Sequence, residues 1–125
     1  MGHRFAGVCL ITPDVPALAA FYARALGVQA VGDDVHAELH TAGASLTIFA
    51  VAGMERMAPR SMQGAGHGSA VIAFKVGEVD AEYARLKALG VEFVMLPTTH
   101  PWGCRSFWFR DPDGNIVDFY AVLAK

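Results

Sequence analysis

The stretch RALGV at residues 24–28 returns as KALGV at residues 87–91, a separation of 63 residues (87 − 24). In both copies the glycine follows an apolar pattern with helical spacing, and a glycine at that point typically ends a helix. Strand-like patterns surround the two copies in the same order, so the chain repeats one unit of strand, helix and three strands. The repeat predicts an α+β fold made of two βαβββ modules.

The first module is expected over about residues 1–52. Asp14 is a good helix N-cap and Pro16 suits the first turn, so a helix begins there and ends at Gly27. Alternating and continuous apolar runs predict the strands of this module at about 4–12, 28–31, 35–41 and 45–52.

The second module is expected over about residues 69–125. Its predicted helix covers about 78–89, and its predicted strands lie at 69–76, 91–95, 104–110 and 115–122. Residues 53–68, between the modules, contain three methionines and four glycines without any periodic pattern. Two interpretations of this segment stay open: a flexible, exposed linker, or a methionine-rich flap over a ligand cavity.

The composition of the chain favours one compact domain, because 54% of its 125 residues are hydrophobic and 18% are charged. Its net charge of -2 and its scattered lysines and arginines argue against a nucleic-acid partner. No apolar run is long enough for a membrane span or a signal peptide, which favours a cytoplasmic protein. Cys9 and Cys104 lack the spacing of a metal or redox site. Free thiols are the simplest interpretation, although one disulfide stays open.

The stretch FRDPDGNIVDFY, residues 109–120, carries a carboxylate, Asp118, in the middle of an apolar strand. If DPDG is a four-residue hairpin loop, the two strands pair outward from Arg110 and Asn115. One face of the hairpin then carries three cross-strand pairs: Phe107 with Asp118, Phe109 with Ile116, and Arg105 with Tyr120. The other face carries Trp108, Val117 and Phe119, which are apolar enough to pack under helices. Asp118 and Arg105 either form an ordinary ion pair or both contact a polar ligand.

A second group of polar side chains occurs in VHAELH, residues 35–40. The apolar residues of this stretch should face the helix, which turns His36, Glu38 and His40 to the other side of the sheet. His36 and His40 lie roughly 13 Å apart along a strand, too far to share one ion. One histidine with Glu38 and Asp118 could form a replacement metal site, but a solvated strand face is the simpler interpretation.

Three stretches resemble the vicinal oxygen chelate superfamily, the glyoxalase/bleomycin resistance/dioxygenase group. They are TPDVPALAAFYARALGV at 12–28, FKVGEVDAEYARLKALGVEF at 74–93 and PWGCRSFWFRDPDGNIVDFY at 101–120. The resemblance implies a single domain in which both modules curve a small mixed sheet around a concave ligand site. It also implies a homodimer, as is common in this superfamily, and the open edges of such small sheets favour pairing as well.

The resemblance also identifies four strand positions that hold a divalent ion in the metal enzymes of the superfamily. They correspond here to Gly7, Val71, Asp118 and either Thr47 or Ile48, and the facing of the VHAELH strand favours Thr47. Glycine, valine and threonine side chains are not useful metal ligands, so we expect no metal ion and no other cofactor.

The sequence therefore predicts a metal-free protein that binds a planar or partly aromatic small molecule, comparable to bleomycin- and mitomycin-type resistance proteins that sequester a drug or metabolite. Trp102, followed by Gly103, is expected at the rim of the cavity. The alternative is a metal-dependent lyase, isomerase or dioxygenase acting on vicinal oxygens. The residues expected to contact the ligand are Trp102, Arg105, Phe107, Phe109, Asp118, Tyr120, His36, Glu38, His40 and Phe49.

Overall fold

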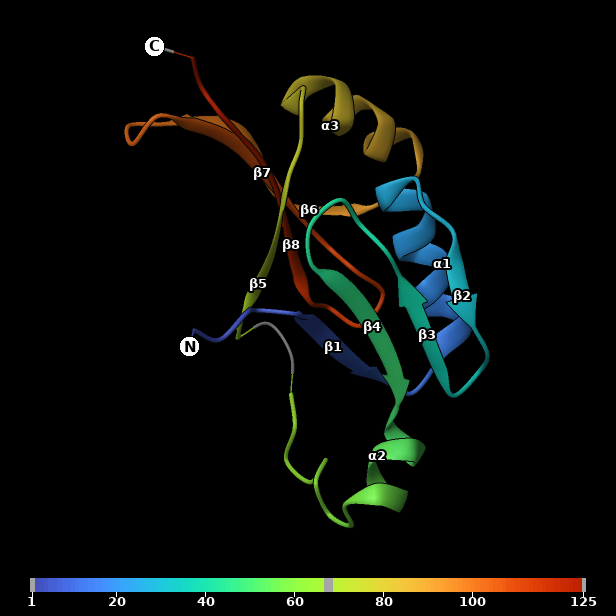
Figure 1. The fold of residues 1–125 in the computed structure, drawn as a ribbon. Helices are drawn as coiled ribbons and strands as arrows, with labels where there is room; N and C mark the ends of the chain where they lie inside the picture. The colour runs from blue at the N-terminus through green and yellow to red at the C-terminus, as the bar shows by residue number, and fades with distance from the viewer. Residues whose placement is uncertain (1, 67–68, 125) are drawn as a thin grey trace. The chain divides into compact units, whose positions relative to one another are not determined.

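A computed structural model describes residues 2–66 and 69–124 of the chain. These residues form two compact units, which divide between Ala65 and Gly66. Each unit contains one four-stranded mixed sheet and a long helix between its first and second strands (Figure 1). No helix in the described part of the chain is long and apolar enough to span a membrane.

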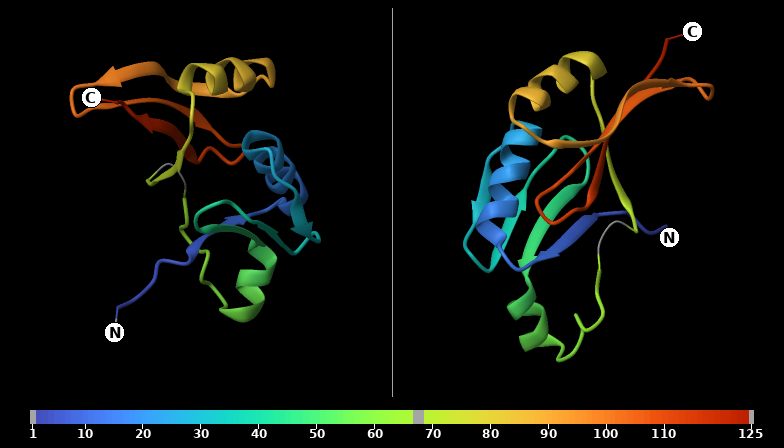
Figure 2. Two further views of the ribbon diagram at one scale, coloured as in Figure 1. Left: turned by 45° about the horizontal axis from the view of Figure 1, so that its top comes forward. Right: turned by 180° about the vertical axis from the view of Figure 1, so that it is seen from behind.

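The first unit begins with strand β1 and helix α1, and three further strands complete its sheet in the order β1-β4-β3-β2. Strand β1 runs parallel to β4, and the other neighbours are antiparallel. Helix α1 lies along β2 and β3 in both views of Figure 2. The elements are β1 (Gly7–Thr12), α1 (Val15–Leu26), β2 (Ala30–Gly32), β3 (His36–Leu39) and β4 (Ser45–Ala50).

Helix α1 begins and ends as the sequence predicts. The Asp14 carboxylate accepts a hydrogen bond of 3.1 Å from the Ala17 N–H, which satisfies one free donor of the first turn. Gly27 follows the helix with φ 68°, a backbone conformation that residues with a Cβ rarely adopt. The helix buries Leu18 and Tyr22 completely, and these contacts hold it on the sheet.

The second unit repeats this architecture, with the strand order β5-β8-β7-β6 and β5 parallel to β8. The predicted α+β fold of two βαβββ modules is therefore confirmed. The elements are β5 (Val71–Lys75), α3 (Val79–Ala88), β6 (Glu92–His100), β7 (Cys104–Arg110) and β8 (Ile116–Val122).

The core of the second unit is an aromatic cluster on the face of the sheet that α3 covers. Phe107 and Phe119 are almost inaccessible to solvent, and their ring centroids lie 5.6 Å apart. Tyr83 of α3 contacts Phe107 edge to face at 5.7 Å. Full burial of one such side chain contributes about 1.5–3 kcal/mol, so this cluster fixes which face of the sheet lies under the helix.

The predicted register of the β7–β8 hairpin was wrong by one residue. Arg110 pairs with Ile116 and Trp108 pairs with Asp118 in the structure. The loop has five residues, because the buried Asp111 carboxylate accepts hydrogen bonds from the N–H groups of Asp113 and Asn115, both at 2.9 Å. A shift of one residue exchanges the two faces of a strand, so Trp108 lies beside Asp118 and the predicted phenylalanines do not.

The segment after β4 also differs from the expected irregular linker. Residues Val51–Met57 form a further helix, α2, and Gly53 of this helix packs directly on the Phe49 ring. The Glu55 carboxylate accepts hydrogen bonds from the backbone N–H groups of Arg60, at 2.6 Å, and Met62, at 2.9 Å. These bonds hold the following turns against α2. A helix of only seven residues leaves too short a periodic pattern to recognise. Residues 67–68 of the expected linker lie outside the described residues.

Candidate functional site

The face of the second sheet opposite α3 carries the candidate site. Alternation along β7 and β8 places Ser106 and Trp108 of β7 and Asp118 and Tyr120 of β8 on this side. We call it the Asp118 face. Ser106 lies opposite Tyr120, and Trp108 lies opposite Asp118, so the four residues form two adjacent cross-strand pairs.

Asp118 and Trp108 both have an unsatisfied polar atom on this face. Asp118 Oδ1 and Trp108 Nε1 are buried and have no hydrogen-bond partner of normal geometry among the described residues. Burial raises the pKa of the Asp118 carboxyl, and the nearby Trp108 indole and the charge of His100 partly offset this effect. The indole N–H thus interacts with the carboxylate, although the two groups do not reach hydrogen-bond geometry. Buried polar groups without partners are uncommon and mark candidate ligand sites.

His100, at the end of β6, joins this face through Ser106. Its Nε2 lies 2.8 Å from the Oγ of the buried Ser106. Trp102, in the turn between β6 and β7, stacks on the His100 ring with a centroid distance of 4.6 Å and an interplanar angle of 5°. The Trp102 side chain is 74% exposed, so it belongs to the surface of the unit and not to its core.

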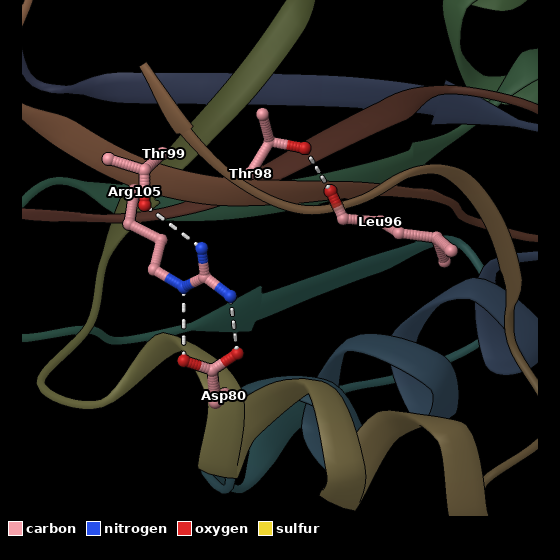
Figure 3. Close-up of polar contacts among 5 residues, drawn as sticks. All are labelled: Asp80, Leu96, Thr98, Thr99 and Arg105. Atoms are coloured by element: carbon pink, nitrogen blue, oxygen red, sulfur yellow. Dashed lines mark hydrogen bonds and ion pairs between the residues drawn. The ribbon is translucent and has the colours of Figure 1, made fainter. Parts of the chain in front are cut away.

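Arg105 does not approach Asp118, contrary to the predicted pairing. The register places it on the face of α3, where its Nε and Nη2 donate to the Asp80 carboxylate at 3.0 and 2.8 Å (Figure 3). Its Nη1 donates to the Thr99 hydroxyl at 3.0 Å. This bidentate ion pair joins the first turn of α3 to the sheet. Arg105 is therefore occupied by a structural contact.

Phe107 and Phe109 also lie on the face of α3, where both are fully buried. We expected both side chains on the same face as Asp118. The shift of the register by one residue puts them on the opposite face, where Phe107 pairs with Phe119 and Phe109 with Val117. Tyr120 is on the Asp118 face and half-buried, as expected, but its cross-strand partner is Ser106 and not Arg105.

The polar strand of the first unit faces the side that was predicted. Ala37 and Leu39 are buried on the α1 side, which turns His36 and Glu38 to the other side of β3. Glu38 Oε2 lies 3.5 Å from Nε2 of the exposed His40. The His36 ring contacts Phe49 edge to face at 6.1 Å. The expected cavity shared by these residues and Asp118 stays a prediction.

The residues at the four metal-ligand positions do not fit a divalent ion. Asp118 lies opposite Ala73 in the second sheet, and Thr47 lies opposite Cys9 at the matching place in the first. Thr47 is therefore the counterpart of Asp118, as the strand facing indicated, and Gly7 and Val71 contribute no donor side chain. In residues 2–66 and 69–124, no three His, Cys, Asp or Glu side chains are grouped to bind a metal. These positions therefore offer no set of side chains that would hold a divalent ion.

Comparison with known proteins agrees with this architecture. The sequence profile of the Glyoxalase/Bleomycin resistance protein/Dioxygenase superfamily matches residues 4–119. The chain belongs to this superfamily. A superfamily protein from Nocardioides has a similar structure, with 24% identity and a TM-score of 0.82 over 98% of this chain and 85% of that chain. A superfamily enzyme from Burkholderia phytofirmans PsJN is 21% identical, with a TM-score of 0.84 over 94% and 98% of the two chains.

Two further proteins are similar to this chain, one in structure and one in sequence. A lactoylglutathione lyase from Agrobacterium tumefaciens is 22% identical, with a TM-score of 0.78 over 96% of this chain and 94% of that chain. The Bacillus subtilis protein YraH is 32% identical over 78 residues, which are 62% of this chain and 59% of YraH. At 21–24% identity, the structural matches establish the fold of this chain, but they do not identify its ligand.

Sequence reasoning missed three residues of the Asp118 face: His100, Ser106 and Trp108. Trp108 was assigned to the wrong side because the loop was counted as four residues. His100 was expected in a loop, whereas β6 continues to it through Pro97, with irregular pairing between Met95 and Thr98. The signal available for Ser106 was its polar side chain among the apolar and aromatic residues of β7.

Proposed function

We propose that this superfamily member binds a small, planar or partly aromatic organic molecule at the Asp118 face without using a divalent metal ion. The observation that carries the proposal is the side-chain chemistry at the metal-ligand positions of the superfamily. Gly7, Val71 and Thr47 offer no useful donor, whereas Asp118 keeps a carboxylate. A single carboxylate binds a divalent ion weakly, but it can orient an organic ligand.

The residues of the Asp118 face suit such a ligand. Trp108 and Tyr120 provide aromatic surface, and both are half-buried and not sealed in the core. Asp118 and the linked Ser106–His100 pair provide a few polar groups among them. A small number of polar groups within apolar walls is typical of small-molecule sites. Sequestration of a drug or metabolite is the function this chemistry supports best.

The proposal also includes a homodimer in a reducing cytoplasm. Strand β6 is an edge of its sheet, and its Val94 and Leu96 side chains are 40% and 58% exposed. Edge strands with exposed apolar residues favour pairing with a second copy. Cys9 and Cys104 are both free thiols, which is consistent with a reducing compartment. Light scattering should give about twice the chain mass of 13.3 kDa, and a value near 13.3 kDa would contradict the dimer.

Two measurements on the purified protein test the metal-free binding function. Elemental analysis of protein produced in metal-supplemented medium should find no stoichiometric zinc, nickel, iron or manganese. Tryptophan fluorescence titrated with a panel of planar aromatic compounds should reveal saturable binding, which Trp108→Phe alters and Phe5→Ala, on an exposed residue of the other unit, does not. One equivalent of metal that is lost in Asp118→Ala would overturn the proposal.

A further inference from the structure

The carboxylate of Asp118 forms no ion pair in the described part of the chain. Lys75 of β5 lies on the same side of the sheet without reaching it, and the charge of His100 only partly offsets the effect of its burial. The two arginines of β7 are engaged elsewhere: Arg105 with Asp80, and Arg110 with Glu92 at 3.3 Å. A ligand of the Asp118 face would therefore meet a carboxylate whose charge has not been neutralised by a neighbouring arginine.

This unpaired carboxylate is also half-buried, so its charged form has lost part of its hydration. Asp118 Oδ1 is buried without a hydrogen bond of normal geometry, and the nearby Trp108 indole N–H replaces the lost water only in part. A ligand that brings N–H donors and a positive charge would restore both interactions at once. Charge-assisted hydrogen bonds of this kind are roughly twice as strong as those between neutral groups.

The two aromatic residues of the face favour the same class of ligand. Trp108 lies directly opposite Asp118, and Tyr120 lies two residues along β8 on the same side. Aromatic rings attract cations through their negative faces, so carboxylate and rings act in the same direction. They also offer apolar surface to a planar group attached to the cation.

We infer that the ligand of the Asp118 face is an organic cation, a protonated amine or amidine attached to a planar group, whose N–H groups are directed at Asp118. This inference rests on the function proposed above and adds the charge of the ligand to it. Ser106 and His100 then border the site and limit the size of the planar group. A neutral compound of the same shape binds more weakly, because it leaves the carboxylate without a counter-charge.

Benzamidine and benzamide test this inference, because they have nearly the same planar shape and differ in charge. Each is titrated into the whole protein and followed by NMR through the indole N–H signals of Trp108 and Trp102, the only two tryptophans. We expect benzamidine to shift the Trp108 signal and to bind at least about tenfold more tightly than benzamide. Asp118→Asn keeps the shape of the side chain and should reduce that ratio to about one.

The matched control is Asp113→Asn, which removes one negative charge from the hairpin loop next to β8. Asp113 Oδ2 is buried without a partner, as Oδ1 of Asp118 is, but it lies outside the Asp118 face. The ratio should persist in this variant, and an equal loss in both variants would reduce the effect to net charge and overturn the inference. If Asp118→Asn does not fold, the wild-type ratio and its fall with added salt decide the question.

The possible failures of the two proposals can be told apart. If benzamide and neutral aromatic compounds shift the Trp108 signal as strongly as benzamidine, the ligand is not a cation, although the proposed binding function stands. If no compound of either charge shifts the Trp108 signal at millimolar concentration, both proposals are wrong.

Discussion

Replacing Asp111 should destabilise the protein far more than replacing Asp113, two residues further along the same loop. Asp111 is only 4% exposed and accepts three hydrogen bonds: from the N–H groups of Asp113 and Asn115, both at 2.9 Å, and from the Asn115 amide at 2.8 Å. A hydrogen bond to a charged group contributes about 1.5–3 kcal/mol. Two of the three bonds end on Oδ1 and one on Oδ2 of the same carboxylate, so their energies do not simply add, and the backbone donors can bind water once the carboxylate is removed. We therefore expect Asp111→Ala to cost about 3 kcal/mol.

The comparison with Asp113→Ala isolates the hydrogen bonds from the general effect of truncating an aspartate. Asp113 Oδ2 is buried without a hydrogen-bond partner, so its removal should change the free energy of unfolding by less than about 0.5 kcal/mol. Urea denaturation measures both, and with a slope of about 2 kcal/mol per molar Asp111→Ala should lower the midpoint by about 1.5 M. Equal midpoints for the two variants would refute the role given to Asp111 in fixing the hairpin register.

Three further predictions concern α2, α3 and the exposed indole. Gly53→Ala should loosen α2 and lower the melting temperature more than Gly43→Ala, because a Cβ at Gly53 would lie 2.6 Å from the ring beneath it, whereas one at Gly43 meets its nearest atom at 3.9 Å. Arg105 lowers the pKa of Asp80, so this ion pair stabilises the fold above the unfolded pKa of about 4 and ceases to do so as the pH falls through the lower folded value. Arg105→Ala should raise the Asp80 pKa in an NMR titration. Trp102→Ala should cost at most about 1 kcal/mol, since the side chain is 74% exposed.

Controls for the last two predictions lie elsewhere in the chain. Hydrogen bonds from the Val35 and His36 N–H groups lower the pKa of Asp33, and this shift should persist in Arg105→Ala. A change at both aspartates would indicate a global effect. Phe107→Ala should cost about 3–5 kcal/mol, because that ring is fully buried. If Trp102→Ala melted as early as Phe107→Ala, the surface position of Trp102 would be wrong.

The sequence allowed the fold to be predicted because the signals for it are local and occur twice. The Asp14 cap and the glycine stops at Gly27 and Gly90 depend on backbone chemistry within a few residues. The hairpin register depends instead on where the Asp111 side chain forms its hydrogen bonds, which the DPDG motif alone does not specify. One residue of difference there moved Trp108 to the Asp118 face and Phe107 away from it.

The length of β6 was underestimated for a different reason. The predicted strand ends at residue 95, two residues before Pro97, and proline cannot donate to a central ladder. Strand β6 lies at the edge of its sheet, where proline is tolerated, and it continues to His100. Edge position is a property of the assembled sheet and has no local signal in the sequence. The hydrogen bond between His100 and Ser106 could therefore not be predicted from the sequence alone.

The matching strand orders of the two sheets have a consequence for how the protein is made. Every ladder in the described residues joins strands of the same unit, and the longest closures are Gly7 with Ser45 and Val71 with Ile116. A ribosome that has released the first 65 residues has released all four strands of the first sheet. That half can complete its hydrogen bonding while the second is still being translated, so a nascent chain does not have to hold unpaired edges open for strands that arrive later.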